Sequence, residues 1–200
     1  EIRLSLVGSE MCIRDSQKAS GLLVFSGIVI FCFYSFVLLK ERLPVEKFGY
    51  DAVFFILLIL CFAWGGDTCA YFAGRAFGKH KLCPVVSPKK TVEGAIGGVL
   101  GTMVFGVVAT LIYSIAANRM EAFTRSNIGV SMYVIIALLA CVAAVLGIYG
   151  DLFASVVKRQ CGIKDYGTIF PGHGGILDRF DSVMFIAPFV TMVVIAVFYH

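Results

Sequence analysis

The chain has 200 residues, of which 59% are hydrophobic and 15% are charged. Soluble domains are usually about 45–50% apolar and about 25% charged, so this composition excludes a water-soluble globular protein. The formal net charge is +4, and in a membrane protein an excess of Lys and Arg reports orientation and does not indicate nucleic-acid binding. A spanning helix takes about 20 apolar residues, so the length leaves room for five or six spans joined by short loops.

Five apolar segments follow one another along the chain, and each is long enough to cross a hydrocarbon core as a helix. In the third segment, Gly97 and Gly101 form a small-xxx-small pattern, which predicts close packing against another helix. The sequence therefore predicts an all-α, polytopic membrane protein with about five transmembrane helices. The predicted spans cover residues 21–39, 52–74, 94–117, 131–157 and 183–199.

The loops between these segments differ in basic charge. One side of the membrane receives the N-terminal residues and the second and fourth loops, with twelve Lys and Arg, and the other side receives five. The positive-inside rule therefore predicts that both large basic loops face the cytoplasm. The twelve are Arg3, Arg14, Lys18, Arg75, Lys79, Lys81, Lys89, Lys90, Lys158, Arg159, Lys164 and Arg179, and the five are Lys40, Arg42, Lys47, Arg119 and Arg125.

Two acidic residues, Asp67 and Asp151, lie inside predicted spans, where an aspartate costs about 2.5–3.5 kcal/mol on insertion scales. One interpretation is a carboxylate that an internal Lys or Arg neutralises purely to fix helix packing. Each Asp, however, follows a glycine, Gly66 or Gly150, which leaves room for a ligand or a cation to approach. We therefore favour a ligand site.

A basic segment stands just before the third span, where Ser87 begins the run Ser-Pro-Lys-Lys-Thr-Val-Glu-Gly. Ser before Pro predicts a helix N-cap and first helical position, which places Lys89 and Lys90 in the first turn. Because the helix dipole disfavours cations there, we expect an anion to compensate them. With the hydroxyls of Ser87 and Thr91, this segment would form a polyphosphate cradle. The alternative is a basic cluster that contacts acidic lipid headgroups.

The loop over residues 155–182 combines both charge signs with several glycines. Three of these glycines surround His173 in the run Pro-Gly-His-Gly-Gly, and they bring backbone N–H groups close to a ligand. Carboxylates with a single nearby His favour a hard cation such as Mg²⁺ over zinc. The loop therefore predicts a site for a metal ion and a phosphate group.

At these residues the sequence resembles the phosphatidate cytidylyltransferase family, also called the CDP-diacylglycerol synthases. The family signature consists of Ser-x-x-Lys-Arg-x-x-x-x-Lys-Asp, then Pro-Gly-His-Gly-Gly, then Asp-Arg-x-Asp, and every fixed position is met. The Gly-Asp-Thr around Asp67 and the run at 87–94 also resemble family segments, so the resemblance covers about residue 52 to the C-terminus. Val92 departs from it, since an aromatic residue is frequent there. The signature positions are Ser155, Lys158, Arg159, Lys164, Asp165, Pro171, Gly172, His173, Gly174, Gly175, Asp178, Arg179 and Asp181.

The N-terminal residues differ from the rest of the chain. The first residue is Glu1 and not Met, and residues 5–16 are polar and aperiodic. We expect residues 1–20 to be a truncated or non-native segment outside the fold, which agrees with the larger number of N-terminal helices in family members. The resemblance implies a membrane-embedded cytidylyltransferase domain over residues 21–200, with its catalytic core over about 52–182.

The resemblance implies an enzyme of phospholipid biosynthesis, a nucleotidyltransferase that converts CTP and phosphatidate into CDP-diacylglycerol and pyrophosphate. It implies Mg²⁺ as the cofactor, with a second metal or monovalent ion allowed beside it. The implied partners are CTP, phosphatidate and the lipid bilayer, with a homodimer allowed and no nucleic acid. The expected location is the bacterial inner membrane, with the endoplasmic reticulum as the alternative, and an active site that faces the cytoplasm.

The resemblance also implies roles for individual residues. A phosphate monoester has a second pKa of about 6 and is largely dianionic at neutral pH, so charge neutralisation matters more than a strong base. His173 is therefore expected to donate to a phosphate oxygen, with a general base as its alternative role. The catalytic residues would be Lys158, Arg159, Lys164, Asp165, His173 and Arg179. The residues that bind CTP and phosphate would be Asp67, Ser87, Lys89, Lys90, Thr91, Glu93, Ser155, Gly174 and Gly175, and the metal ligands would be Asp151, Asp178 and Asp181, with Asp67 and Asp165 as further candidates.

Two other functions stay open. A CTP-dependent lipid kinase of the same superfamily, acting on a polyprenol, would transfer the γ-phosphoryl group of CTP and would need a base to deprotonate the alcohol. An ion-coupled transporter would also explain intramembrane aspartates and glycine-interrupted helices, but it would not explain the basic, glycine-rich loop. CTP labelled at the α or the γ position distinguishes the lipid kinase from the cytidylyltransferase, since the kinase would transfer only the γ label to lipid.

Overall fold

The structure is a computed structural model that describes residues 2–84, 86–119, 129–163, 166, 175 and 177–198. Of residues 2–20, 22 and 198 only the secondary structure is described. Nearly all of the described chain is helical, as predicted, and one two-stranded sheet interrupts the helices. The elements are α1 (Ile2–Arg42), α2 (Val45–Phe48), α3 (Asp51–Phe77), β1 (Lys81–Cys83), β2 (Ser87–Thr91), α4 (Val92–Arg119), α5 (Val130–Gln160), the 3₁₀ turn η1 (Leu177–Arg179) and α6 (Val183–Phe198).

Four of the described helices are long and apolar enough to cross a membrane: the part Leu23–Arg42 of α1, and α3, α4 and α5. The fifth predicted span corresponds to α6, which has 16 residues and is therefore about 24 Å long at 1.5 Å per residue. It is apolar but shorter than the roughly 30 Å hydrocarbon core. The prediction of an all-α, polytopic membrane protein is confirmed.

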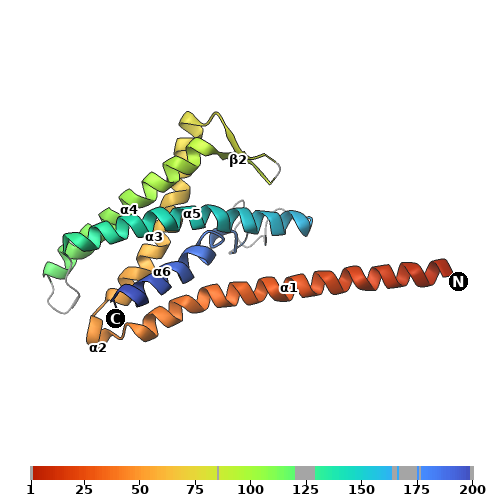
Figure 1. Ribbon diagram of the computed structural model, residues 1–200, viewed down its shortest axis with the longest axis horizontal. Helices are drawn as coiled ribbons and strands as arrows, with labels where there is room; N and C mark the ends of the chain where they lie inside the picture. Colours follow the sequence, from red (N-terminus) through yellow and green to blue (C-terminus); the bar gives the residue numbers. More distant parts are fainter. Residues whose placement is uncertain are drawn as a thin grey trace.

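The helices pack into a bundle in which α3 lies against α4, α4 against α5, and α6 between α5 and the C-terminal half of α1 (Figure 1). Phe62 of α3, Ile136 of α5 and Val190 of α6 belong to one buried apolar core. Many large apolar side chains on the outer helix faces are exposed, for example Ile30 and Leu100. Such a surface is costly in water and favourable against lipid tails.

The contact between α3 and α4 depends on glycine. A Cβ added to Gly97 would collide with the side chain of Ala73, and one added to Gly101 would collide with Cys69. Small residues at these positions let the two backbones approach closely. The packing role predicted for Gly97 and Gly101 is therefore confirmed.

The segment before α4 is a β-hairpin and not the start of the helix, so the prediction that Ser87 caps the helix is wrong. Ser87 and Thr91 are the ends of β2, which pairs with β1 in antiparallel register. The residue before a proline is biased towards extended backbone, and Pro is tolerated in a strand at a sheet edge. Helix α4 begins at Val92, and the N–H of Gly94 donates to Thr91 Oγ1 at 3.2 Å, so Thr91 is the N-cap.

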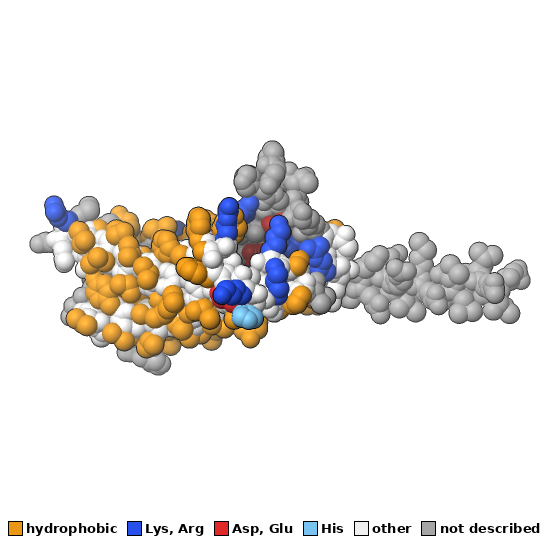
Figure 2. Space-filling model, turned by 90° about the horizontal axis from the view of Figure 1, so that it is seen from above, with side chains coloured by type: hydrophobic (Ala, Val, Ile, Leu, Met, Phe, Trp, Pro, Cys, Tyr) orange, Lys and Arg blue, Asp and Glu red, His pale blue; other side chains and the backbone are white. Residues whose placement is uncertain are grey.

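The polar ends of several elements meet at one end of the bundle. The C-terminal ends of α3 and α5, the β-hairpin and the beginning of α6 lie together there (Figure 1). Viewed over the hairpin, Lys and Arg side chains gather beside acidic and histidine side chains, while hydrophobic side chains cover the other part of this face (Figure 2). This polar end contains most of the residues that the sequence singled out.

Candidate functional site

Four aspartates from different elements form the centre of the polar end. Asp67 comes from the last part of α3 and Asp151 from the last part of α5, while Asp178 lies in η1 and Asp181 in the turn before α6. The hydroxyl of Ser182 donates to Asp67 Oδ2 at 3.0 Å, which joins the beginning of α6 to α3. The two intramembrane acids thus face the same region, at the end of the bundle where the basic segments lie.

Lys158 of α5 neutralises two of these acids. Its Nζ lies 2.9 Å from Asp178 Oδ1 and 3.8 Å from Asp181 Oδ2. The side chains of Lys158 and Asp178 are only 12% and 10% exposed, so the pair is largely screened from water. The Nζ also lies 5.3 Å from the centre of the Tyr166 ring, within the range of a cation–π interaction.

Asp178 is additionally held by the backbone. Its Oδ2 accepts the N–H of Tyr166 at 2.8 Å and the N–H of Gly175 at 2.9 Å. Burial by itself raises the pKa of Asp178, but Lys158 and the two amides outweigh it and hold the pKa below its ordinary value. Asp178 is therefore a fixed carboxylate anion at neutral pH, and it orders part of the loop between α5 and α6.

Asp181 has the opposite tendency. It is 7% exposed, and burial, followed by repulsion from Asp151 and Asp67, raises its pKa to about 7, although Lys158 and the N–H of Ser182 act against this. The three acids are thus close enough to repel one another. Another cation near Asp181 would relieve this repulsion.

The β-hairpin reaches the acids through Lys90. The ammonium group of Lys90 forms an ion pair with Asp151, and both side chains are about one quarter exposed. One helical turn further along α5, the hydroxyl of Ser155 donates to Asp151 Oδ1 at 3.3 Å. The segment before α4 and the end of α5 are therefore joined at the same acidic centre.

An open cavity of about 570 Å³ lies on the α3 side of the acids. Trp64, Asp67 and Thr68 line it from α3, and residues 178–181 line it from the other side. The indole N–H of Trp64 donates to the carbonyl of Arg179 at 3.2 Å. The Trp64 ring also contacts the Phe180 ring edge to face, with centroids 6.0 Å apart. The cavity thus combines aromatic walls with acidic and basic groups, as an amphiphilic ligand requires.

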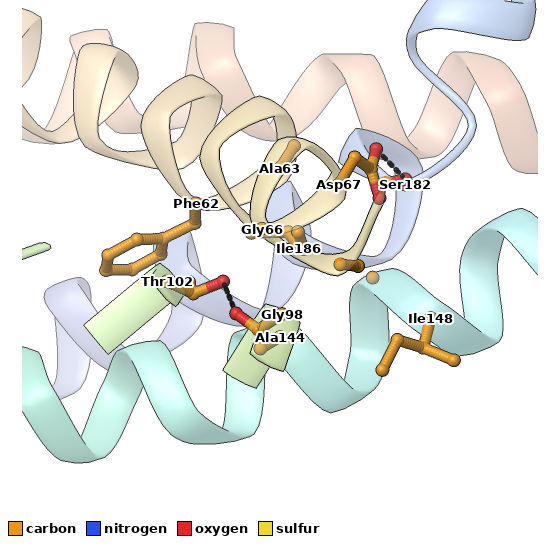
Figure 3. Close-up of a pocket in the computed structure, with 12 residues that line it drawn as sticks. Phe62, Ala63, Gly66, Asp67, Gly98, Thr102, Ala144, Ile148, Ser182 and Ile186 are labelled. Carbon is orange, nitrogen blue, oxygen red and sulfur yellow. Dashed lines mark hydrogen bonds between the residues drawn. The ribbon is translucent and has the colours of Figure 1, made fainter. Parts of the chain in front are cut away.

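A second, small cavity of about 20 Å³ lies inside the bundle behind Asp67 (Figure 3). Gly66 and Thr102 are part of its lining, and the Thr102 hydroxyl donates to the carbonyl of Gly98 at 2.8 Å. A cavity of this size has room for about one water molecule. Asp67 consequently stands between this small interior space and the larger open cavity.

The acids fit a hard cation by their chemistry, because carboxylate and hydroxyl oxygens are the ligands that Mg²⁺ takes. Within the described part of the chain, however, no group of three or more His, Cys, Asp or Glu side chains is arranged to hold a metal ion. The predicted ligands have other partners here, since Lys90 pairs with Asp151 and Lys158 with Asp178. The magnesium site therefore stays a prediction.

The other predicted residues are distributed around this centre. Lys89 is exposed on β2, and Arg159 and Arg179 are exposed at the ends of α5 and η1. Glu93 accepts hydrogen bonds from the chain itself, at residues 79 and 80. Four predicted site residues lie outside the described residues: Lys164, Asp165, His173 and Gly174.

Sequence reasoning missed Ser182, Trp64, Tyr166 and His80. Trp64 carried a signal, since it stands three residues before Asp67 and hence on the same face of a helix. Ser182 directly follows the Asp-Arg-x-Asp run. Tyr166 and His80 contact the site through loops, and no spacing rule indicates such contacts.

The fold and the site together define a class of protein, a polytopic α-helical membrane protein with an acid and lysine centre at one end of the bundle. The model of the Cytidylyltransferase family matches residues 4–197, and the chain therefore belongs to this family. The resemblance seen in the sequence is confirmed.

Individual bacterial relatives named phosphatidate cytidylyltransferase agree with this assignment. The chain is 40% identical over 145 residues to the protein of Staphylococcus haemolyticus (strain JCSC1435), a match covering 72% of this chain and 50% of the relative. It is 41% identical over 147 residues to that of Staphylococcus saprophyticus, covering 74% and 51%, and 34% identical over 171 residues to that of Bacillus subtilis (strain 168), covering 85% and 56%. The chain thus spans about half the length of the curated relatives it matches.

Proposed function

We propose that the protein transfers the cytidylyl group of CTP to phosphatidate and so forms CDP-diacylglycerol and pyrophosphate. The observation that carries this proposal is the convergence of two basic segments, far apart in the sequence, on one group of acids. Lys90 reaches Asp151 from the hairpin, and Lys158 reaches Asp178 from α5. The names of the bacterial relatives support the same reaction.

This arrangement suits a reaction between two anions. Phosphatidate is a phosphate monoester and is largely dianionic at neutral pH, so it can attack the α-phosphorus of CTP without a strong base. The oxygen–phosphorus bond to the lipid forms as the bond to pyrophosphate breaks, and the leaving group takes the electron pair. Fixed cations near the transferred group would stabilise the charge that develops.

The two substrates would approach from different sides of the acids. The nucleotide triphosphate would lie over β2, where Lys89, Lys90 and the hydroxyl of Ser87 can bind its oxygens. Phosphatidate would place its headgroup in the cavity of about 570 Å³, near Arg179, and its tails along the aromatic wall of Trp64 and Phe180. Because the outer helix faces are apolar and exposed, the acyl tails would remain in the bilayer while the headgroup is bound.

Magnesium would be held by Asp151, Asp178 and Asp181, with Asp67 nearby, and when bound it would neutralise charge on the triphosphate. For that to happen, the ammonium groups of Lys90 and Lys158 would move from the carboxylates to phosphate oxygens. A monovalent ion beside Mg²⁺ and a homodimer remain predictions. The bacterial relatives favour the inner membrane, with the basic end of the bundle at the cytoplasm.

The test is a labelling experiment on the full-length natural protein, purified in detergent with phosphatidate. CTP labelled at the α-phosphate should transfer its label to the lipid, and CTP labelled at the γ-phosphate should release it as pyrophosphate. Label that reaches lipid from the γ-phosphate alone, with a polyprenol as acceptor, would replace this proposal with the lipid-kinase alternative.

A further inference from the structure

Glu93, the second residue of α4, holds the loop between α3 and β1. Its Oε2 accepts the N–H of Lys79 at 3.1 Å and the N–H of His80 at 3.2 Å. Its Oε1 lies 2.6 Å from Nδ1 of the His80 ring. One carboxylate thus contacts two consecutive backbone amides and an imidazole from a segment 13 and 14 residues earlier in the chain.

The chemistry of the contact fixes its direction. A surface Glu carboxylate is ionised at neutral pH and can only accept hydrogen bonds. The His80 ring must therefore carry a hydrogen on Nδ1, and this N–H donates a hydrogen bond to Glu93. Charge-assisted hydrogen bonds of this kind are roughly twice as strong as neutral ones. The His80 side chain is 78% exposed, so its ring contributes through this bond and not through burial.

The same place closes the base of the β-hairpin. The N–H of Val92 donates to the carbonyl of His80 at 3.0 Å, and Lys81 pairs with Thr91 in the next position. A two-stranded hairpin alone is only marginally stable in water, and β1 has three residues. The contacts of Glu93 therefore tie the first strand to the beginning of α4, which the close packing against α3 keeps in place.

The contacts at the base of the hairpin affect the position of Lys90. Lys90 stands next to Thr91, at the end of β2 that the contacts of Glu93 hold, and its ammonium pairs with Asp151 of α5. A hairpin free to swing about its base would carry Lys90 away from α5, because an extended lysine side chain spans only about two residue spacings of a β-strand.

We propose that Glu93 is a positioning residue, which clamps the base of the hairpin through His80 and so holds Lys90 at the acidic centre where the nucleotide binds. This inference rests on the proposed function for the identity of the nucleotide. It gives Glu93 an indirect role in place of the CTP contact that the family resemblance implies. The competing explanation is that Glu93 only complements the positive N-terminal end of α4.

Four variants of the full-length protein separate the two explanations. His80→Ala removes the imidazole donor and leaves the charge at the helix end, and Glu93→Asp keeps that charge on a side chain shorter by one methylene. His80→Asn puts an amide N–H near the position of Nδ1 and should restore the contact. Lys79→Ala is the matched control, because Lys79 joins the clamp through its backbone N–H.

The first measurement is hydrogen exchange of the β2 amides, compared with amides inside α4. In His80→Ala and Glu93→Asp the β2 amides should exchange about tenfold faster, as expected for the loss of one charge-assisted hydrogen bond, while the α4 amides keep their rates. His80→Asn and Lys79→Ala should match the natural protein. Unchanged β2 exchange in His80→Ala and Glu93→Asp would overturn the clamp.

The second measurement is steady-state kinetics with CTP and phosphatidate. His80→Ala should raise the KM for CTP about fivefold to tenfold with little change in the KM for phosphatidate, and His80→Asn should recover it. Faster β2 exchange with an unchanged KM for CTP would overturn the positioning role. If the natural protein does not turn over CTP, the proposed function fails, whereas the exchange rates still decide whether Glu93 and His80 order β2.

Discussion

Replacing Lys158 with Met gives the most direct test of the acidic centre. Methionine has a similar length and no charge, so Lys158→Met removes the ammonium group that lies 2.9 Å from Asp178 Oδ1 and 3.8 Å from Asp181 Oδ2. Asp178 would then remain as a nearly buried carboxylate without its cation. Its two backbone N–H donors would stay in place.

The size of the effect follows from these contacts. Breaking a buried ion pair by removing one partner costs about 3–5 kcal/mol in the free energy of unfolding, and the two remaining N–H donors place Lys158→Met at about 3 kcal/mol. Asp178→Asn should cost about 2 kcal/mol, because Lys158 keeps Asp181 as a partner. The double variant removes both charges of the Lys158–Asp178 pair, so it should cost about 2 kcal/mol less than the sum. Asp181 loses Lys158 both in Lys158→Met and in the double variant, so this loss cancels in the comparison.

The assay is equilibrium unfolding in mixed detergent micelles at pH 8, above the pKa of about 7 for Asp181, with EDTA present. Arg159→Met is the control, because Arg159 follows Lys158 on α5 and is exposed. It should change the free energy of unfolding by less than about 0.5 kcal/mol. Additivity of the two single changes, within about 0.5 kcal/mol, would refute the Lys158–Asp178 pair.

Three further predictions concern Asp181, the glycine contact between α3 and α4, and the metal ion. Because the pKa of Asp181 is raised to about 7, Asp181 keeps a proton in the folded protein that it loses in the unfolded chain. Without metal, Asp181 should therefore lower the free energy of unfolding by up to about 1.4 kcal/mol per pH unit between pH 4 and 7, and its contribution should then level off; a slope that is not reduced in Asp181→Asn would contradict this cause. Gly101→Ala should destabilise the protein by about 1–3 kcal/mol through its collision with Cys69, whereas Gly27→Ala, which meets nothing within 4 Å, should not; equal effects on unfolding would count against the helix contact. EDTA should stop CTP turnover and Mg²⁺ should restore it, and turnover that continues in EDTA would remove the metal from the proposed site.

The helices could be predicted from the sequence because long apolar runs leave few alternatives. The hairpin could not, since β1 is three residues long, too short to show an alternating pattern, and Ser87 before Pro is compatible with either a helix start or a strand. Pairing with β1 decides between them, and that contact forms only in the folded chain. The same reasoning explains why Thr91, and not Ser87, is the N-cap.

The acids were predictable and their partners were not. Asp67 and Asp151 are conspicuous inside apolar runs, and Asp178 and Asp181 belong to the family signature in the charged loop. Lys90 and Lys158 were expected to bind phosphate, and the structure pairs them with Asp151 and Asp178. Which lysine meets which acid depends on where the hairpin and the end of α5 come together in space. Neither charge pattern nor spacing along the chain contains that information.

These pairs also bear on how a membrane enzyme can keep several acids together before its substrates arrive. Asp67, Asp151 and Asp181 repel one another, and without nearby cations this repulsion would oppose folding of the bundle end. Lys90 and Lys158 reduce it, and each is long and flexible enough to transfer its ammonium group to a phosphate oxygen. If the proposed function holds, the same two lysines would stabilise the acids before binding and the triphosphate afterwards. Their replacement by Met would then affect stability and nucleotide affinity together, whereas the loss of an exposed cation such as Lys89 would affect affinity alone.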